Sequence, residues 1–279
     1  MGDFSPNKSL GQNFLTDKNI ILKTIEHFNL SDGDNVIEIG PGKGALTELL
    51  LLRNIKLTAV EIDNRAVQLL TSKFKDKLDD GLSIINKDIR EFDLREFITI
   101  NSINNKIKVI GNIPYNISSD IIFWLLHNTE NISKAQIMLQ KEVADRLVAR
   151  PGIKDYGILT LAVQMCGTAK KLFDVSSGSF YPSPKVTSTV LEINFFESKH
   201  PDFIELMKII KAAFNQRRKM LRNSLKDFIN RSTNGQIKSF IDDFDNKYDN
   251  FFMRRPEQLS FIEFETLFNS LKSYESISK

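Results

Sequence analysis

The chain has 279 residues, of which 41% are hydrophobic and 26% charged, with a formal net charge of +3, as is usual for a globular protein with room for two domains. The single cysteine, Cys166, excludes an internal disulfide and a cysteine-cluster metal site, and the three widely spaced histidines argue against a zinc site. No apolar run approaches the roughly 18 residues of a membrane span, and the N-terminus lacks the apolar core of a secretory signal, so we expect a cytoplasmic protein with no metal and no membrane partner.

The first predicted element is a helix that begins after Asp17. Asp17 is a suitable N-cap, and Ile21, Ile25 and Phe28 fall on one helical face. The segment before it, residues 9–15, has the sequence Ser-Leu-Gly-Gln-Asn-Phe-Leu. Its polar residues alone indicate only a stretch that leads into a helix.

A glycine-rich turn follows at residues 40–44. The apolar run at 36–39 is typical of a buried strand, and residues 45–52 have the pattern of a helix. Glycines let the backbone turn sharply and approach a ligand closely, and the start of a helix presents free N–H groups. The turn therefore predicts a nucleotide-type cofactor at the carboxyl end of the first strand of a doubly wound sheet.

This turn does not identify the cofactor. The spacing Gly40-x-Gly42-x-x-Ala45 also satisfies the dinucleotide fingerprint, with Glu61 at a suitable distance for a ribose. A methyl-donor cofactor, a nicotinamide cofactor and a plain strand-to-helix turn all remain open at this point.

Strands and helices alternate through the following residues, which predicts a mostly parallel sheet. Further strands are predicted at 56–63, 82–89, 109–111, 135–140 and 188–195, and helices at 65–74, 118–127, 142–149 and 159–164. Strands are also predicted directly after the helix at 159–164, and the close succession of the last two strands predicts a hairpin at one edge of the sheet.

Two carboxylates lie near the ends of the second and third predicted strands. Glu61 can accept hydrogen bonds from ribose hydroxyls, and Asp88 can accept one from an adenine amino group. Ile62 and Ile89 can enclose the adenine ring between them. Either carboxylate alone could instead cap a helix.

The tetrad Asn112-Ile113-Pro114-Tyr115 ends the next predicted strand. Its asparagine oxygen and a nearby main-chain carbonyl can accept both N–H bonds of a planar exocyclic amine. Pro114 stiffens the loop, and Tyr115 offers a flat face to a base. A turn with a buried tyrosine is the alternative. Here the chain resembles the Rossmann-like methyltransferases that use S-adenosylmethionine, and the resemblance favours a methyl donor over a nicotinamide.

Five motifs, in order, resemble the 16S ribosomal RNA adenine dimethyltransferases over nearly the whole chain. They are Leu-Gly-Gln-Asn-Phe-Leu at 10–15, Glu-Ile-Gly-Pro-Gly-x-Gly-x-Leu-Thr at 38–47, Asn-Ile-Pro-Tyr-Asn at 112–116, Phe-x-Pro-x-Pro-Lys-Val at 180–186 and Phe-x-x-Arg-Arg-Lys-x-x-x-Asn-x-Leu at 214–225. The resemblance implies an α/β fold: a Rossmann-like methyltransferase domain over residues 1–199 and a small helical RNA-binding domain over 200–279. Ile113 and Tyr181 are slight departures from the family pattern.

The resemblance also implies roles for individual residues. Asn112, Tyr115 and Phe180 are the expected catalytic residues, the two rings stacking on the faces of the target adenine. The residues expected to bind S-adenosylmethionine are Asn13, Leu15, Gly40, Glu61, Ile62, Asp88, Ile89 and Asn112.

Positive charge is concentrated in one part of the second predicted domain. Residues 208–231 contain eight basic residues and one acid, Asp227. Such an excess favours contact with a polyanion, and a solvated helix face is the alternative. We expect the phosphates of rRNA to be contacted by Arg217, Arg218, Lys219 and Arg222.

Together these observations predict a monomeric enzyme that uses S-adenosylmethionine to dimethylate N6 of two adjacent adenosines near the 3′ end of 16S rRNA. The substrate would be the immature small ribosomal subunit, and the reaction would belong to ribosome biogenesis. Three alternatives remain: methylation of a 23S rRNA adenosine, which the helical-domain motif disfavours; a non-enzymatic checkpoint in small-subunit assembly; and a nicotinamide oxidoreductase.

Overall fold

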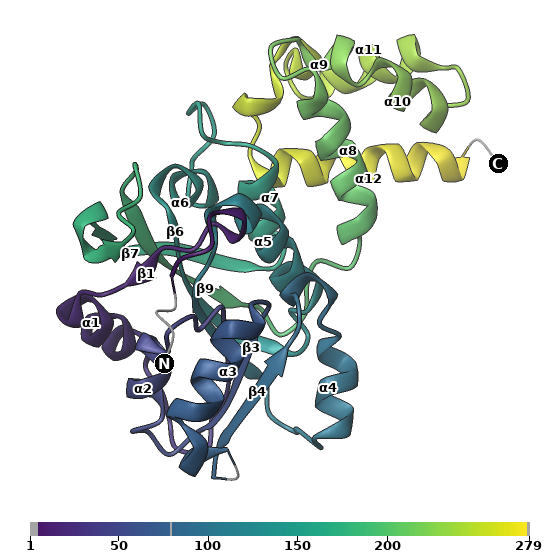
Figure 1. Cartoon of the computed structure of the whole chain (residues 1–279). Helices are drawn as coiled ribbons and strands as arrows, with labels where there is room; N and C mark the ends of the chain where they lie inside the picture. The colour runs from purple at the N-terminus through teal and green to yellow at the C-terminus, as the bar shows by residue number, and fades with distance from the viewer. Residues whose placement is uncertain (1–4, 79, 278–279) are drawn as a thin grey trace. The chain divides into compact units, whose positions relative to one another are not determined.

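The computed structural model describes residues 5–78 and 80–277, which form two compact units (Figure 1). The first comprises Met1–Ala144 and Cys166–Lys199, and the second Asp145–Met165 and His200–Lys279. The predicted division at residues 199 and 200 differs from these units in the placement of residues 145–165. They join the second unit because α7 (Ile158–Gln164) packs its apolar side against α8 (Phe203–Asn215).

The first unit is built on a seven-stranded sheet in the order β4-β3-β2-β5-β6-β9-β7. The strands are β2 (Asn35–Ile39), β3 (Lys56–Glu61), β4 (Leu82–Asn86), β5 (Ile107–Asn112), β6 (Ile132–Gln140), β7 (Gly167–Val175) and β9 (Ser188–Phe195). The pairs from β4 to β6 are parallel, whereas β9 runs antiparallel to both β6 and β7. This confirms the predicted mostly parallel sheet with an antiparallel pair at one edge.

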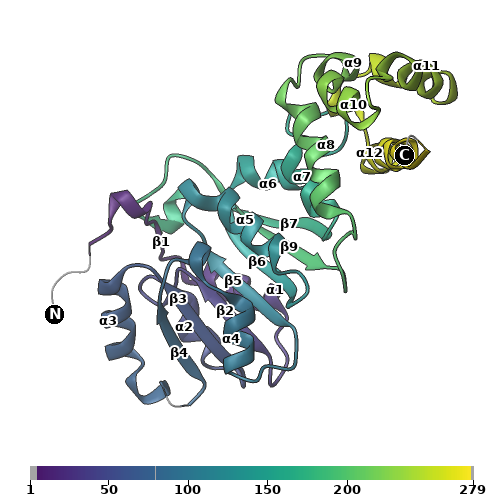
Figure 2. The same ribbon diagram turned by 90° about the vertical axis from the view of Figure 1, so that its right-hand side faces the viewer.

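Helices pack on both faces of this sheet (Figure 2). They are α1 (Lys18–Phe28), α2 (Ala45–Leu50), α3 (Asn64–Lys73), α4 (Leu94–Ile100) and α5 (Ser118–His127), and α6 (Lys141–Leu147) then crosses from the first unit of the chain into the second. The predicted cap of α1 is confirmed, since the Asp17 carboxylate accepts hydrogen bonds from the backbone N–H groups of Asn19 and Ile20. α1 and α2 share one apolar cluster with β2 and β3, to which Phe28, Leu50 and Leu57 belong.

A two-stranded ladder that the sequence did not predict joins two distant segments of the first unit. β1 (Phe14–Leu15) pairs antiparallel with β8 (Phe180–Tyr181), so that Phe14 lies opposite Tyr181 and Leu15 opposite Phe180. The backbone N–H groups of Thr16 and Asp17 extend the connection by donating to the carbonyl of Ser179. The N-terminal segment is therefore fixed to the proline-containing loop before β9.

The second unit is helical, as predicted. Besides α7 and α8 it contains α9 (Leu221–Ser224), α10 (Lys226–Ser232), α11 (Ile237–Lys247) and α12 (Phe261–Ile277). Much of its core is aromatic, and Phe240, Phe244 and Phe252 contact one another. Within the described ranges of both units, every helix is too short or too polar to cross a lipid bilayer.

Candidate active site

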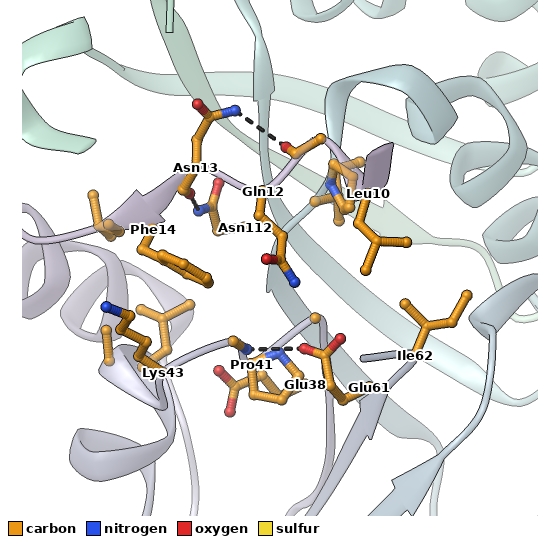
Figure 3. Close-up of a pocket in the computed structure, with 18 of the residues that line it drawn as sticks. Leu10, Gln12, Asn13, Phe14, Glu38, Pro41, Lys43, Glu61, Ile62 and Asn112 are labelled. Atoms are coloured by element: carbon orange, nitrogen blue, oxygen red, sulfur yellow. Dashed lines mark hydrogen bonds between the residues drawn. The ribbon is translucent and has the colours of Figure 1, made fainter. Parts of the chain in front are cut away.

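A pocket opens at the carboxyl ends of β2, β3 and β5, where a doubly wound sheet is expected to bind its ligand (Figure 3). Its walls come from the N-terminal segment, the glycine turn, the end of β3 and the tetrad after β5. The predicted site residues that line it are Asn13, Leu15, Gly40, Glu61, Ile62, Asn112 and Tyr115. Segments that contain Asn13 and Asn112, 99 positions apart in the sequence, thus meet at one edge of the sheet.

The glycine turn makes one wall of the pocket by a close approach of backbone to side chain. Gly40 and Gly42 have φ angles of +63° and +56°, in the left-handed region that favours glycine. A Cβ atom on Gly42 would lie 2.8 Å from the ring of Phe14. The glycine therefore allows the N-terminal segment to lie directly against the turn.

The N-terminal segment crosses the pocket and is held at two points. Gln12 Nε2 donates to Asp63 Oδ2 at 3.0 Å, beyond the end of β3. Asn112 Nδ2 donates to the carbonyl oxygen of Asn13 at 2.9 Å, at the tetrad. Figure 3 shows the segment facing Pro41, Glu38 and Glu61 across the pocket.

Two buried carboxylates lie on the opposite wall. Glu61 is 4% exposed, and its oxygens accept from the backbone N–H groups of Gly42 at 3.0 Å and Asp63 at 2.9 Å. Glu38 is 1% exposed and accepts from the hydroxyl of Thr47 at 2.7 Å. Burial raises the pKa of Glu61, and it raises the pKa of Glu38 to about 7. Neither carboxylate pairs with a cationic side chain among the described residues.

These acceptors fit a ligand that carries hydroxyl groups and a positive charge, because such groups would satisfy buried carboxylates that the protein leaves without a cation. A nucleoside sulfonium such as S-adenosylmethionine has both. Glu38 was not predicted as a site residue. The available signal was an acidic residue inside an otherwise apolar strand, where a charge is costly to bury.

Two of the predicted cofactor residues do not line the pocket. The guanidinium of Arg90 donates to both carboxylate oxygens of Asp88: Oδ2 accepts from Nε at 3.0 Å and from Nη2 at 2.6 Å, and Oδ1 accepts from Nε at 3.1 Å. Hydrogen bonding to Arg90 lowers the pKa of Asp88. Ile89 is buried in the 3-10 turn that follows, Ile89–Glu91. Binding of an adenine amino group by Asp88 thus stays a prediction, in which Arg90 would have to share the carboxylate.

The tetrad presents its asparagine to the pocket in a defined orientation. Asn112 is half-buried at the end of β5, and its Nδ2 donates a hydrogen bond to the carbonyl of Asn13. Its Oδ1 is therefore available to accept a hydrogen bond from a ligand. Tyr115 follows on the 3-10 turn Tyr115–Ile117, and its hydroxyl lies 2.5 Å from Ser188 Oγ.

Phe180 does not line the pocket in this structure. It is 4% exposed and packs with Leu15 in the apolar cluster beneath the β1–β8 ladder. Side chains alternate between the two faces of a strand, so the next residue, Tyr181, is exposed instead. The predicted stacking of Phe180 on an adenine is not tested by this arrangement and stays a prediction.

The predicted RNA-binding residues lie where α8 ends and α9 begins. Arg218, Lys219 and Arg222 are exposed. Arg217 is half-buried and donates to the carbonyl of Ile153 at 3.3 Å, and its Nε lies 3.9 Å from Glu257. Of these four residues, Arg217 thus has the strongest structural role within the second unit.

Sequence comparison matches residues 3–249 to the ribosomal RNA adenine dimethylase family. A ribosomal RNA small subunit methyltransferase A from Pseudomonas aeruginosa is 39% identical over 267 residues, which cover 95% of this chain and 94% of the relative. Another, from Malacoplasma penetrans, is 38% identical over 259 residues, 92% of this chain and 88% of the relative.

Comparison of structures agrees. A dimethyladenosine transferase from Plasmodium falciparum superimposes with a TM-score of 0.79 at 25% identity, covering 93% of this chain and 98% of that one. The 23S rRNA methyltransferase ErmE has a TM-score of 0.69 at 22% identity, covering 93% and 100%, a likeness that shows the fold alone.

Proposed function

The chain belongs to the ribosomal RNA adenine dimethylase family, and we propose that it dimethylates N6 of two adjacent adenosines near the 3′ end of 16S rRNA, with S-adenosylmethionine as methyl donor. The observation that carries the proposal is the pocket at the sheet edge. One wall holds the tetrad that suits an exocyclic amine, and another holds two buried carboxylates that suit a nucleoside cofactor. The curated relatives are named for the small subunit, which favours 16S over 23S rRNA.

Different residues of the pocket would bind different parts of the cofactor. Glu61 would accept from the ribose hydroxyls, and Glu38 would face a positively charged group. Ile62, 46% exposed at the pocket, would cover the adenine ring. Bound S-adenosylmethionine would supply a reactive methyl group on its sulfonium, so the protein mainly has to position the two reactants.

The tetrad would bind and orient the target amine. The adenine must leave its stack to enter the pocket, where the ring of Tyr115 would lie against one of its faces. Asn112 Oδ1 and a main-chain carbonyl of the tetrad would accept the two N6 hydrogens. These bonds reduce conjugation of the N6 lone pair with the ring and aim that lone pair at the methyl group.

We expect the amine proton to leave to solvent after transfer. The side chains beside Asn112 in the tetrad are Ile113, Pro114 and Tyr115, which are not bases at neutral pH, and burial raises the pKa of the Tyr115 phenol further. A second methylation requires in addition that the pocket accept the monomethylated amine.

The test is to incubate the protein with isotope-labelled S-adenosylmethionine and unmethylated small ribosomal subunits, and then to analyse the nucleosides by mass spectrometry. The expected product is N6,N6-dimethyladenosine in the small-subunit RNA. Label in large-subunit RNA would instead support the 23S alternative. Binding to the subunit without incorporation of label would instead support a non-enzymatic role as a checkpoint in small-subunit assembly.

A further inference from the structure

Ser188, which starts β9, touches the tetrad from a distant part of the sequence. It has no exposed surface, and its Oγ lies 2.5 Å from the hydroxyl of Tyr115. β9 lies between β6 and β7, and Ser188 pairs with Gln140 on one side and Val175 on the other. The backbone of Ser188 is therefore held from both sides, and its position at the start of an interior strand is rigid.

The backbone of Tyr115 is held from one side, where its carbonyl oxygen accepts from the backbone N–H and the Oγ of Ser118. It starts a 3-10 turn of three residues whose N-cap, Pro114, makes no side-chain capping bond. The ring is half-buried. Among the described residues, Ser188 is the hydrogen-bond partner of the Tyr115 hydroxyl. The position of the ring therefore depends on what holds the far end of the side chain.

We propose that Ser188 is a positioning residue for methyl transfer. It would fix the phenol of Tyr115 and thereby the plane of the ring against which the target base stacks. The proposal rests on the function proposed above. Transfer needs the amine nitrogen in line with the methyl group, and a small displacement of the base lowers the rate steeply. Without the serine hydroxyl, the half-buried phenol would lose its partner and the ring would be free to turn.

Thr189, the next residue on β9, offers a matched control. It too has no exposed surface, and its hydroxyl donates to Asp174 Oδ1 at 2.7 Å, away from the tetrad. Thr189→Val removes a buried hydroxyl from the same strand with little change in shape. It therefore measures the effect of a general loss of stability on activity.

The experiment is a double-mutant cycle of Ser188→Ala and Tyr115→Phe in the full chain, assayed on small ribosomal subunits. We expect each single variant to lower kcat roughly tenfold to a hundredfold, and the double variant to be no slower than either single one. KM and the affinity for S-adenosylmethionine, measured by calorimetry, should stay within about twofold. Thr189→Val should lower the unfolding temperature and leave kcat unchanged.

The proposal is overturned if Ser188→Ala leaves kcat unchanged, or if it lowers kcat by the same factor in the Tyr115→Phe background as in the native one. An equal loss of kcat in Thr189→Val would also overturn it, since that would assign the effect to stability. Failure of the proposed function itself is recognised separately, because the native protein would then form no dimethyladenosine.

Discussion

Asn112 contacts two parts of the site at once, and its two roles can be separated by substitution. Its Nδ2 holds the N-terminal segment through Asn13, and its Oδ1 is the proposed acceptor of the target amine. Asn112→Ala should lower kcat by about 10²–10³-fold, a loss typical of one removed polar contact to the reacting group. Cofactor affinity should fall much less than kcat, because Asn112 is one of eight residues expected to bind the cofactor.

Asn112→Asp is the informative partner of that variant. It keeps an oxygen that can accept from the amine and loses the donor to Asn13, so we expect kcat between those of the native protein and Asn112→Ala. Single-turnover assays with saturating cofactor measure the rates, and calorimetry measures cofactor affinity. Native turnover in Asn112→Ala would refute the assigned role.

Glu38 should make the folded protein less stable as pH rises, the opposite of a carboxylate whose pKa is lowered on folding. Burial raises its pKa from 4.5 to about 7, so in the folded protein the carboxyl holds its proton over a range where the unfolded chain has lost it. Stability therefore falls as pH rises from about 4.5 to about 7, and the penalty, roughly 3 kcal/mol, is complete above that range and absent below it.

Glu38→Gln removes this ionisation and can still accept from Thr47. Without cofactor, it should unfold several degrees higher than the native protein at pH 8 and at nearly the same temperature at pH 5. Thermal unfolding at both pH values measures this. An equal difference at the two pH values would show that the gain does not come from ionisation of Glu38.

The site residues that could be predicted are those whose place depends on the ends of buried strands. Glu61 and Asn112 end strands that their apolar runs identify, and parallel strands bring such ends together. The side-chain environment of Asp88 could not be predicted, because it depends on Arg90, which turns back onto the carboxylate. The burial of Phe180 depends on its pairing with Leu15, 165 positions earlier.

At the scale of elements, length decided what the sequence could predict. The strands β2, β5 and β9 have five, six and eight residues and contain apolar residues that predict them, and α1 has a clear cap. β1 and β8 have two residues each and no period to detect, so they form only because each meets the other. The predicted strand 82–89 ends earlier, at Asn86, because Asp88 caps the 3-10 turn after it.

A buried ion pair ties β6 to β9 and can be tested against an exposed one on the same carboxylate. Lys134 Nζ lies 2.6 Å from Glu192 Oε2, and Lys170 Nζ lies 2.9 Å from Oε1, but the lysine side chains are 14% and 64% exposed. Burial alone would raise the pKa of Glu192, but hydrogen bonds from Lys134, Lys170 and Asn194 lower it to about 2.

Lys134→Met should lower the free energy of unfolding by roughly 3 kcal/mol at pH 7, because it leaves a buried carboxylate with its exposed partner only. Lys170→Met should cost less than about 1 kcal/mol, since an exposed pair contributes little. Urea unfolding curves give both values. Equal losses in the two variants would mean that burial does not distinguish these pairs.

At the scale of the whole chain, the sequence could not predict to which unit residues 145–165 belong. The chain leaves the first unit after β6, contributes α7 to the second, and returns as β7. The short apolar pattern of α7 would suit a helix on the sheet equally well. Only packing against α8, which begins about 40 residues later, assigns it to the second unit.

Charge is also distributed unevenly over the chain, and this predicts where RNA phosphates are bound. Residues 1–199 have 24 basic and 24 acidic residues, whereas residues 200–279 have 14 and 11. Arg218 and Lys219 are exposed, and no ion pair of theirs occurs in the part of the chain that the structure describes. They are thus the best placed of the predicted residues to release counterions from RNA.

Changing both Arg218 and Lys219 to Ala should weaken binding to small ribosomal subunits and reduce the slope of log affinity against log salt by about two, one for each phosphate contact. The unfolding temperature should not change. Arg217→Ala, in contrast, should lower the unfolding temperature, because it removes the bond to Ile153.

The matched control changes Lys208 and Lys272 to Ala, which removes the same net charge from the same unit. Both are exposed, but Lys208 pairs with Glu205 at 2.7 Å and Lys272 with Asp202 at 3.0 Å, so their charges are already compensated. Their loss should leave the salt slope unchanged. If both double variants lower the slope equally, net charge alone drives binding. If neither does, the basic segment is a solvated helix face.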